Sequence, residues 1–162
     1  MKVQAIKENN WGDILVIQED AYHEFALEEL EVLKSKQFVS PDTCFVCMSE
    51  LGDVLGYLLS HPWRGFEPPK LSQSLLYVEE SESLFLHDMA VKPLAKGRGA
   101  GRSMLNELIK IAKKKGVKNI TLVAVQGAKR FWSLFGFKEV SNHQVCSSYG
   151  ENAVLMNKVI ET

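Results

Sequence analysis

The stretch "VKPLAKGRGAGRSML" (residues 91–105) places three glycines between a predicted strand and a predicted helix. Gly97, Gly99 and Gly101 alternate with Arg98 and Ala100, and an apolar helical pattern follows at once. Glycine allows sharp bends and lets a ligand approach the backbone closely. A helix start with free N–H groups favours anions. The stretch therefore predicts a phosphate or pyrophosphate site, and a turn that only needs flexible residues is the alternative.

The residues on either side of this turn predict a central strand and a helix. "LFLHDMAV" (84–91) is apolar on both alternating faces except at His87 and Asp88, which is typical of a strand covered on both sides. Leu105, Leu108 and Ala112 form an apolar stripe at helical spacing over residues 100–115.

The rest of the chain predicts a mixed α/β domain. We expect a strand at 2–7, a helix capped by Asn10, a second helix containing Leu27, Leu30 and Leu33, and a hairpin formed by 43–49 and 54–61. Residues 62–83 form a long irregular insertion. After the glycine turn and its helix come a buried strand at 119–125, a short helix ending at Gly136 and two late strands. The predicted order is β-α-α-β-β-β-α-β-α-β-β.

Composition and charge restrict the class of protein. The chain has 162 residues, of which 46% are hydrophobic and 24% are charged. This length and composition predict a single domain over residues 1–162. The net charge of -1 gives no indication of nucleic-acid binding, and no apolar run has the length of a signal peptide or a membrane span. We therefore expect a cytoplasmic protein with no nucleic-acid or membrane partner.

The cysteines predict a structural role rather than a metal site. The sequence has three cysteines, Cys44, Cys47 and Cys146. An odd number of cysteines, together with the lack of a signal-peptide pattern, is typical of a protein in a reducing compartment. Cys44 and Cys47 form a CxxC motif within a predicted strand, where their side chains point to opposite faces. A second cysteine or histidine pair at metal spacing is missing, so we expect no metal.

The glycine turn matches neither common nucleotide motif. GxxxxGK[ST] does not occur, and the third glycine of a dinucleotide fingerprint would fall at Met104. Its wider context, "LHDMAVKPLAKGRGAGRSML" followed by "ITLVAV" and "AKRFWSLFGF", resembles the GCN5-related N-acetyltransferase (GNAT) superfamily. In that family's Q/R-x-x-G-x-G/A signature, Gly99 and Gly101 fill the small positions and Lys96 replaces Gln or Arg. The close match covers about residues 84–140 and ends at Gly136 and Phe137.

The resemblance implies a mixed, mostly antiparallel sheet with splayed fourth and fifth strands and about four helices. It implies acetyl-CoA as cofactor, with its pyrophosphate held by the turn and its pantetheine paired with the fourth strand. The implied cofactor residues are Met89, Ala90, Val91, Lys96, Gly97, Arg98, Gly99, Ala100, Gly101 and Arg102. Between parted strands, the amide of Met89 is the candidate donor to the oxyanion of acyl transfer.

His87, Asp88 and Tyr149 are the candidate catalytic residues. His87 matches a base-pathway histidine in arylalkylamine acetyltransferases, and histidine suits proton relay, although a hydrogen-bonded core histidine is the alternative. Asp88 either shares this role or holds a loop or helix in place. In a regular strand the two side chains face opposite ways and form no dyad, but a bulge would change that.

The last predicted helix departs from the family pattern. Many members carry a tyrosine four residues after an alanine, whereas Ala128 is followed by Trp132, and the usual Asn is Val125. Indole is no acid near neutral pH, so Trp132 is expected to pack on the cofactor or in the core. Tyr149 is the replacement candidate, with an inert loop tyrosine or protonation by water as alternatives.

The insertion "HPWRGFEPPKL" is the candidate acceptor entrance, and Trp63, Arg64, Phe66 and Glu67 are available to line it. A packing loop or a dimer contact is the alternative.

The predicted function is direct acetyl transfer from acetyl-CoA to a primary amine of a small molecule, amino acid or peptide, without a covalent enzyme intermediate. A non-catalytic CoA-binding regulatory domain and a different phosphate binder are the alternatives. Family members are often dimers, so a homodimer is possible.

Overall fold

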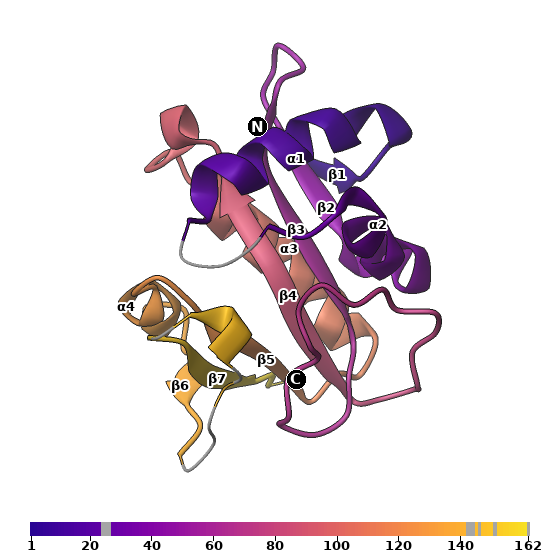
Figure 1. Cartoon of the computed structure of the whole chain (residues 1–162), viewed down its shortest axis with the longest axis vertical. Coiled ribbons are helices and arrows are strands. Elements are labelled where there is room, and N and C mark those ends of the chain that lie inside the picture. The colour runs from indigo at the N-terminus through magenta and orange to yellow at the C-terminus, as the bar shows by residue number, and fades with distance from the viewer. Residues whose placement is uncertain (24–26, 142–144, 146, 151, 162) are drawn as a thin grey trace.

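The computed structural model describes residues 1–23, 27–141, 145, 147–150 and 152–161. Its α-helices are α1 (Trp11–Ala21), α2 (Leu30–Val39), α3 (Ala100–Lys114) and α4 (Lys129–Ser133). Its strands are β1 (Lys2–Ala5), β2 (Phe45–Met48), β3 (Val54–Pro62), β4 (Ser83–Val91), β5 (Asn119–Ala124), β6 (Lys138–Glu139) and β7 (Val154–Val159). The predicted order of elements is confirmed, and Figure 1 shows it along the chain.

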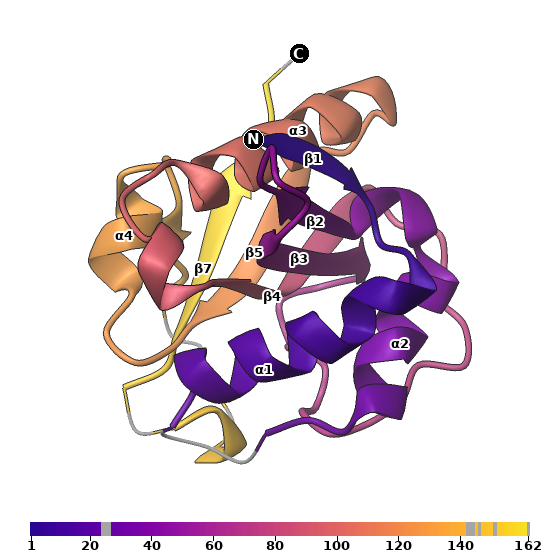
Figure 2. The same ribbon diagram turned by 90° about the horizontal axis from the view of Figure 1, so that it is seen from above.

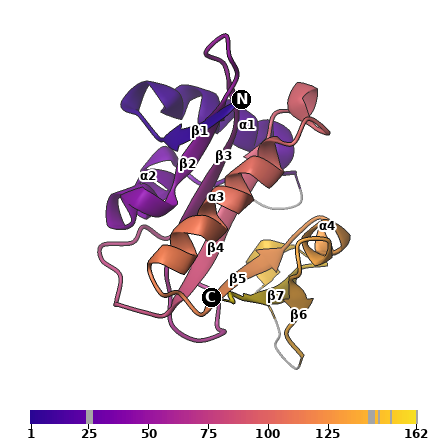
Figure 3. The same ribbon diagram turned by 180° about the vertical axis from the view of Figure 1, so that it is seen from behind.

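The seven strands form one sheet in the order β1-β2-β3-β4-β5-β7-β6. Every neighbouring pair is antiparallel except β4 and β5, which are parallel. The β4–β5 ladder covers only Ser83–Leu86 opposite Asn119–Leu122, so the two strands part beyond Leu86. Figures 1 and 3 show β4 and β5 diverging from this joined end. The expected mostly antiparallel sheet with splayed fourth and fifth strands is therefore confirmed.

Helices cover both faces of the sheet, as Figure 2 shows from above. On one face, Ile14 of α1 and Leu33 of α2 form an apolar core with Tyr57 and Leu59 of β3. On the other face, α3 and α4 share a second apolar core with β4 and β5. Within the described residues, no helix has the length and apolar character needed to cross a membrane.

Cys44, immediately before β2, and Cys47, within β2, lie on different faces of the sheet. Cys44 belongs to the core under α1 and α2, and Cys47 to the core under α3. Both are free and buried. Two thiols on opposite faces cannot hold one metal ion, and the described residues contain no cluster of three or more potential metal ligands. Cys146 lies outside the described residues.

Two local predictions differ from the structure. Asn10 occupies the predicted N-cap position of α1, but its side chain makes no cap hydrogen bond, because its oxygen accepts from the Lys7 N–H at 2.7 Å in a short 3₁₀ turn instead. Leu27 precedes α2, which begins at Leu30, and its side chain is exposed. By contrast, the chain between Pro62 and Ser83 contains neither a helix nor a strand, as predicted.

Candidate active site

The glycine turn presents open backbone at the start of α3. Gly97 and Gly99 have φ of 82° and 89°, a left-handed conformation that favours glycine, and Gly99 is the N-cap of the helix. No side chain caps α3, so the N–H groups of its first turn are free to bind a ligand. A Cβ atom built at Gly97 or Gly99 would meet no atom within 4 Å. Open space, free N–H groups and a 15-residue helix together fit a phosphate group.

A cavity of about 650 Å³ leads from this turn into the gap between β4 and β5. Its lining combines the turn, the parted ends of β4 and β5, helix α4 and the residues that follow α1. It therefore joins the α3 side of the sheet to the α1 side. The lining residues that the sequence predicts are His87, Asp88, Met89, Ala90, Val91, Lys96, Gly97, Gly99, Ala100, Gly101, Arg102, Trp132 and Tyr149. Arg98 is not among the lining residues.

A bulge in β4 places His87 and Asp88 on the same face. Leu59 of β3 pairs with Asp88, and the next residue, Ser60, pairs with Leu86, so His87 is an extra residue without a partner in the ladder. His87 and Asp88 both contact residues near α1 and α2. β4 is therefore not a regular strand, in which these two side chains would point apart.

His87 is paired with Glu28, a residue that precedes α2. Its Nε2 atom lies 2.6 Å from Oε1 of Glu28, and both side chains are almost completely buried. Burial raises the pKa of Glu28, but the hydrogen bond and charge of His87 outweigh it, so the pKa lies below its ordinary value. A carboxylate in this position accepts the Nε2 proton and fixes the imidazole ring. The other ring nitrogen, Nδ1, is buried without a hydrogen-bond partner in the described part of the chain.

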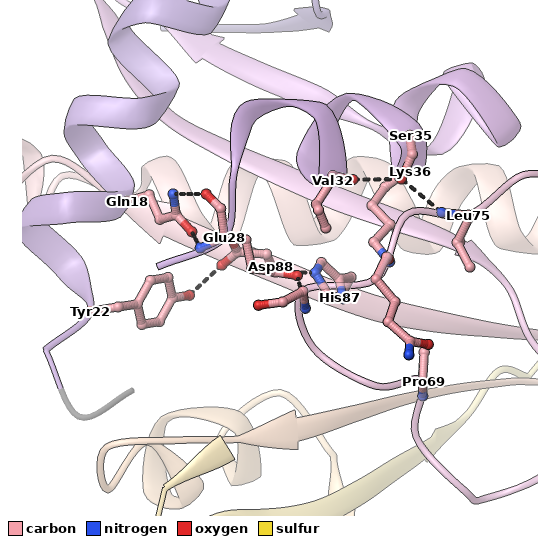
Figure 4. A network of polar contacts seen from close by, with 12 residues as sticks. Gln18, Tyr22, Glu28, Val32, Ser35, Lys36, Pro69, Leu75, His87 and Asp88 are labelled. Atoms are coloured by element: carbon pink, nitrogen blue, oxygen red, sulfur yellow. Dashed lines mark hydrogen bonds and ion pairs between the residues drawn. The ribbon is translucent and has the colours of Figure 1, made fainter. Parts of the chain in front are cut away.

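Gln18 holds the backbone of Glu28 in place. The Gln18 side-chain amide donates to the Glu28 carbonyl at 3.1 Å, and its oxygen accepts from the Glu28 N–H at 2.9 Å. The second carboxylate oxygen of Glu28 accepts the Ser72 N–H at 2.9 Å. Figure 4 shows Gln18, Glu28 and His87 in sequence across the network. The carboxylate is thus oriented from two directions before it meets the imidazole.

Asp88 joins β4 to β3 and to the residue after α1. Tyr57 donates to Oδ2 of Asp88 at 2.6 Å, and the Tyr22 hydroxyl contacts Oδ1 and lies 3.1 Å from the Met89 carbonyl. Burial raises the pKa of Asp88 to about 6, although the charge of His87 and both tyrosine hydroxyls oppose the shift. Burial and the Asp88 charge raise the pKa of Tyr22 and of Tyr57 well above 10, so neither phenol is an effective acid near neutral pH.

A second buried histidine, His61, lies beside His87 with a distance of 6.3 Å between ring centroids. Its Nδ1 atom lies 2.9 Å from the Pro62 carbonyl, and its Nε2 atom has no partner among the residues described. Burial lowers the pKa of His61 to about 3, so the ring is neutral in the folded protein. His61 does not line the cavity.

We expect His61 to weaken the fold in acid. Its pKa is lowered on folding, so the stability it supports is complete above about pH 6.5 and is lost as the pH falls toward 3. For a histidine that cannot be protonated while folded, the loss between pH 7 and pH 5 is about 2 kcal/mol. Urea unfolding of wild type and His61→Phe at both pH values measures it. The free-energy difference between the two proteins should change by that amount; a constant difference would contradict a neutral buried His61.

Residues 63–82, called the strap below, are linked to elements on both sides of the gap. Tyr149 donates its hydroxyl to the Pro69 carbonyl at 2.5 Å, and Leu71 lines the cavity. The lining does not include Trp63, Arg64 or Phe66, the candidate entrance residues. Instead, the Trp63 indole donates to the Glu67 carbonyl, Arg64 binds the Glu80 carbonyl and Phe66 is 41% exposed.

Trp132 occupies the position of the usual tyrosine and lies between the cavity and the core. Its side chain is 7% exposed, and its ring packs edge-on against Phe131 and Phe137, with centroids 5.1 and 5.4 Å away. Nearby, the Arg102 guanidinium lies 5.0 Å from the centre of the Phe135 ring. This cation–π contact keeps the positive charge of Arg102 at the glycine turn. The arrangement matches the expected packing role and provides no proton donor to replace tyrosine.

Sequence reasoning missed Gln18, Tyr22, Glu28 and Tyr57. Glu28 and His87 are 59 residues apart, and Tyr22 and Asp88 are 66 apart, so no local spacing connects them. The one available signal was chemical: two polar residues in an otherwise apolar central strand require buried partners. That signal predicts the existence of partners but not their positions.

The fold and this cavity together define a class: an α/β domain with a cavity between two parted strands and uncapped backbone N–H groups of a helix start in its lining. The chain belongs to the Acetyltransferase (GNAT) family, whose model matches residues 11–137.

Comparisons with individual proteins agree with this family. The chain is 35% identical over 65 residues to an uncharacterized N-acetyltransferase, MJ1207, of Methanocaldococcus jannaschii; the match covers 38% of this chain but only 29% of that relative. Ard1 from Thermoplasma volcanium has a similar structure, with a TM-score of 0.78, 12% identity and coverage of 99% and 98% of the two chains. Rv2747 from Mycobacterium tuberculosis, solved with CoA and NLQ, gives a TM-score of 0.74, 14% identity and coverage of 99% and 100%. The two structural likenesses show the fold.

Proposed function

We propose that this chain is an acetyl-CoA-dependent N-acetyltransferase that transfers the acetyl group directly to a primary amine. The observation that carries the proposal is the continuous cavity, with an anion-binding turn at one end and the Glu28–His87 pair at the other. Family membership supports acyl transfer, and the structural neighbour with bound CoA supports the cofactor.

The residues of the turn would bind the pyrophosphate. N–H groups from Gly99 to Arg102 provide neutral donors, and Lys96 and Arg102 provide positive charge within the cavity lining. When bound, acetyl-CoA supplies a thioester whose C–S bond breaks as the C–N bond to the amine forms, and the thiol leaves.

The parted end of β4 would orient the acyl group. The ladder with β5 ends at Leu86, so the backbone of Met89, Ala90 and Val91 has no strand partner on that edge. The Met89 carbonyl already contacts Tyr22 there. Because the N–H and carbonyl of one strand residue lie on the same edge, the Met89 N–H faces the gap and can donate to the acyl oxygen.

His87 would act as the base. An alkylammonium has a pKa near 10 and must lose a proton before it can attack. Glu28 holds the Nε2 proton of His87, which leaves the lone pair on Nδ1 to accept a proton. Because Nδ1 is buried, this proton would pass from the amine through water rather than by direct contact. Asp88 would hold the end of α1 against β4 through Tyr22, and Tyr149 would remain a candidate proton donor despite its bond to Pro69.

The cofactor can be tested by calorimetric titration of wild type and Gly101→Glu with acetyl-CoA, CoA, ATP and NAD. Gly101 lies in the first turn of α3 and lines the cavity, so a carboxylate there would repel the pyrophosphate. We expect wild type to bind acetyl-CoA and CoA but not ATP or NAD, and Gly101→Glu to bind acetyl-CoA at least tenfold more weakly, a loss of at least about 1.4 kcal/mol.

The matched control for this substitution is Gly12→Glu. Gly12 also lies in the first turn of a helix, α1, where an added Cβ atom would meet no atom within 4 Å, and it does not line the cavity. Its affinity should equal that of wild type. Equal weakening by both substitutions, or no binding of acetyl-CoA by wild type, would contradict the proposed site. Binding without acetyl transfer to any amine would favour a regulatory CoA-binding domain.

A further inference from the structure

The end of the cavity opposite the glycine turn lies beneath the strap. Four residues of the strap, 69–72, connect the two sides of the gap: the Pro69 carbonyl accepts from Tyr149, and the Ser72 N–H donates to Glu28. Four extended residues span at most about 14 Å. Between these two bonds, Leu71 faces the cavity. The strap is therefore a bridge across the region where an acceptor would meet His87.

Further bonds hold the strap against α2, as Figure 4 shows. Lys36 donates to the Gln73 carbonyl at 3.1 Å, and the Leu75 N–H donates to Ser35 Oγ at 2.9 Å. The Lys36 side chain is completely buried, and burial lowers its pKa although Glu28 opposes the shift. The strap supplies this buried ammonium with a hydrogen-bond acceptor, so moving the strap away from α2 would cost free energy.

The charges of the lining are divided between the two ends. Among the lining residues that the structure describes, Lys and Arg occur only as Lys96 and Arg102 at the glycine turn. The opposite end contains the carboxyl groups of Glu28 and Asp88. An ammonium group is favoured beside them, whereas a carboxylate of the ligand would find no lysine or arginine partner.

We infer that the acceptor is a compact amine without a carboxylate, such as an alkylamine or a diamine, rather than an amino acid or the N-terminus of a polypeptide. The inference rests on the proposed function, because it assumes that acetyl-CoA occupies the other end. The strap excludes a long acceptor, and the two carboxyl groups disfavour a carboxylate. Positive charge on the acceptor also matches the acidic end of the cavity.

The test uses the full chain, acetyl-CoA and pairs of acceptors that differ only in the carboxylate: isopentylamine with leucine, and cadaverine with lysine. Leucinamide keeps the size of leucine without its charge, and a leucine-initiated hexapeptide amide tests length. Release of CoA thiol gives kcat/KM for each. We expect at least a tenfold higher kcat/KM for each amine than for its amino acid, leucinamide to exceed leucine, and no detectable transfer to the hexapeptide.

A charge introduced into the lining should change this preference. Leu71→Arg places a cation beside the acceptor, so the leucine-to-isopentylamine ratio of kcat/KM should rise at least tenfold. Leu76→Arg makes the same substitution in the same strap, at a side chain that is 86% exposed and does not line the cavity. Its ratio should equal that of wild type.

The outcomes separate this inference from the proposed function. Faster transfer to the amino acids or to the hexapeptide would overturn the inference and leave the acetyltransferase in place. Binding of acetyl-CoA with no transfer to either amine would also overturn it. Failure to bind acetyl-CoA would overturn the proposed function, and the inference with it.

Discussion

Replacing His87 with phenylalanine should lower kcat for amine acetylation by about 10²–10⁴-fold, the usual contribution of a positioned general base. Phenylalanine keeps an aromatic ring beside Phe85 and His61 but removes both nitrogens. The proton of the attacking amine then has no acceptor at this position. Acetyl-CoA affinity should stay within about twofold, because His87 lies at the opposite end of the cavity from the glycine turn. Steady-state kinetics with titration of acetyl-CoA measures both quantities.

The control is the same replacement at the neighbouring histidine. His61→Phe also removes a buried imidazole from this aromatic cluster, but His61 does not line the cavity, so kcat should equal that of wild type. Glu28→Gln should lower kcat less than His87→Phe, and Glu28→Asp should restore part of the loss, because Glu28 acts by orienting the imidazole. A His87→Phe protein that is folded and retains kcat within threefold would show that His87 is a core residue.

Asp88 should make the folded protein less stable as the pH rises. Its pKa is raised from 3.8 to about 6 on folding, so between these values the folded state binds more protons than the unfolded state. Stability contributed by this group is therefore lost as the pH rises from about 4 to about 6, by about 3 kcal/mol. Asp88→Asn keeps the shape of the side chain and does not titrate. The free energy of unfolding of Asp88→Asn relative to wild type should rise by that amount across the window.

Urea unfolding at several pH values measures the difference. Asp53→Asn is the matched control, because this aspartate is exposed, and its curve should run parallel to that of wild type. Titration of His61 and Glu28 changes the wild-type curve as well, but it is common to both proteins and largely cancels in the comparison. A constant difference between wild type and Asp88→Asn would show that folding does not raise the pKa of Asp88, because the tyrosine hydroxyls and the charge of His87 then balance the effect of burial.

Local patterns in the sequence were sufficient for most of the fold. The apolar run at 84–91 followed by a glycine turn predicted β4 and the start of α3, and the alternation on both sides of "ELGD" predicted the β2–β3 hairpin. Each of these signals arises within about twenty residues, where chain geometry fixes which side chains share a face. Asn10 takes the predicted N-cap position of α1, but its side chain does not cap the helix, because a preceding 3₁₀ turn uses it. Residue type alone does not resolve this competition.

The candidate site was predictable only where its residues lie close together in the sequence. The glycine turn and the polar pair in β4 are local features, and they indicated both ends of the cavity. Glu28 was not predictable, because its position depends on Gln18 and on the strap rather than on a pattern of its own. The long insertion was recognised as important, but the segment that faces the cavity is Leu71 rather than the more conspicuous Trp63 and Arg64.

The bulge in β4 separates the requirements of the sheet from those of the chemistry. Leu86 and Asp88 pair with adjacent residues of β3, Ser60 and Leu59, so a chain lacking His87 could continue the same ladder without interruption. Such a chain would keep Asp88 opposite Leu59, but it would lose the imidazole and the local bend that a bulge introduces. The ladder with β5 ends at Leu86, so this surplus residue stands at the point where the two strands part, and one insertion supplies both the side chain and the change of strand direction.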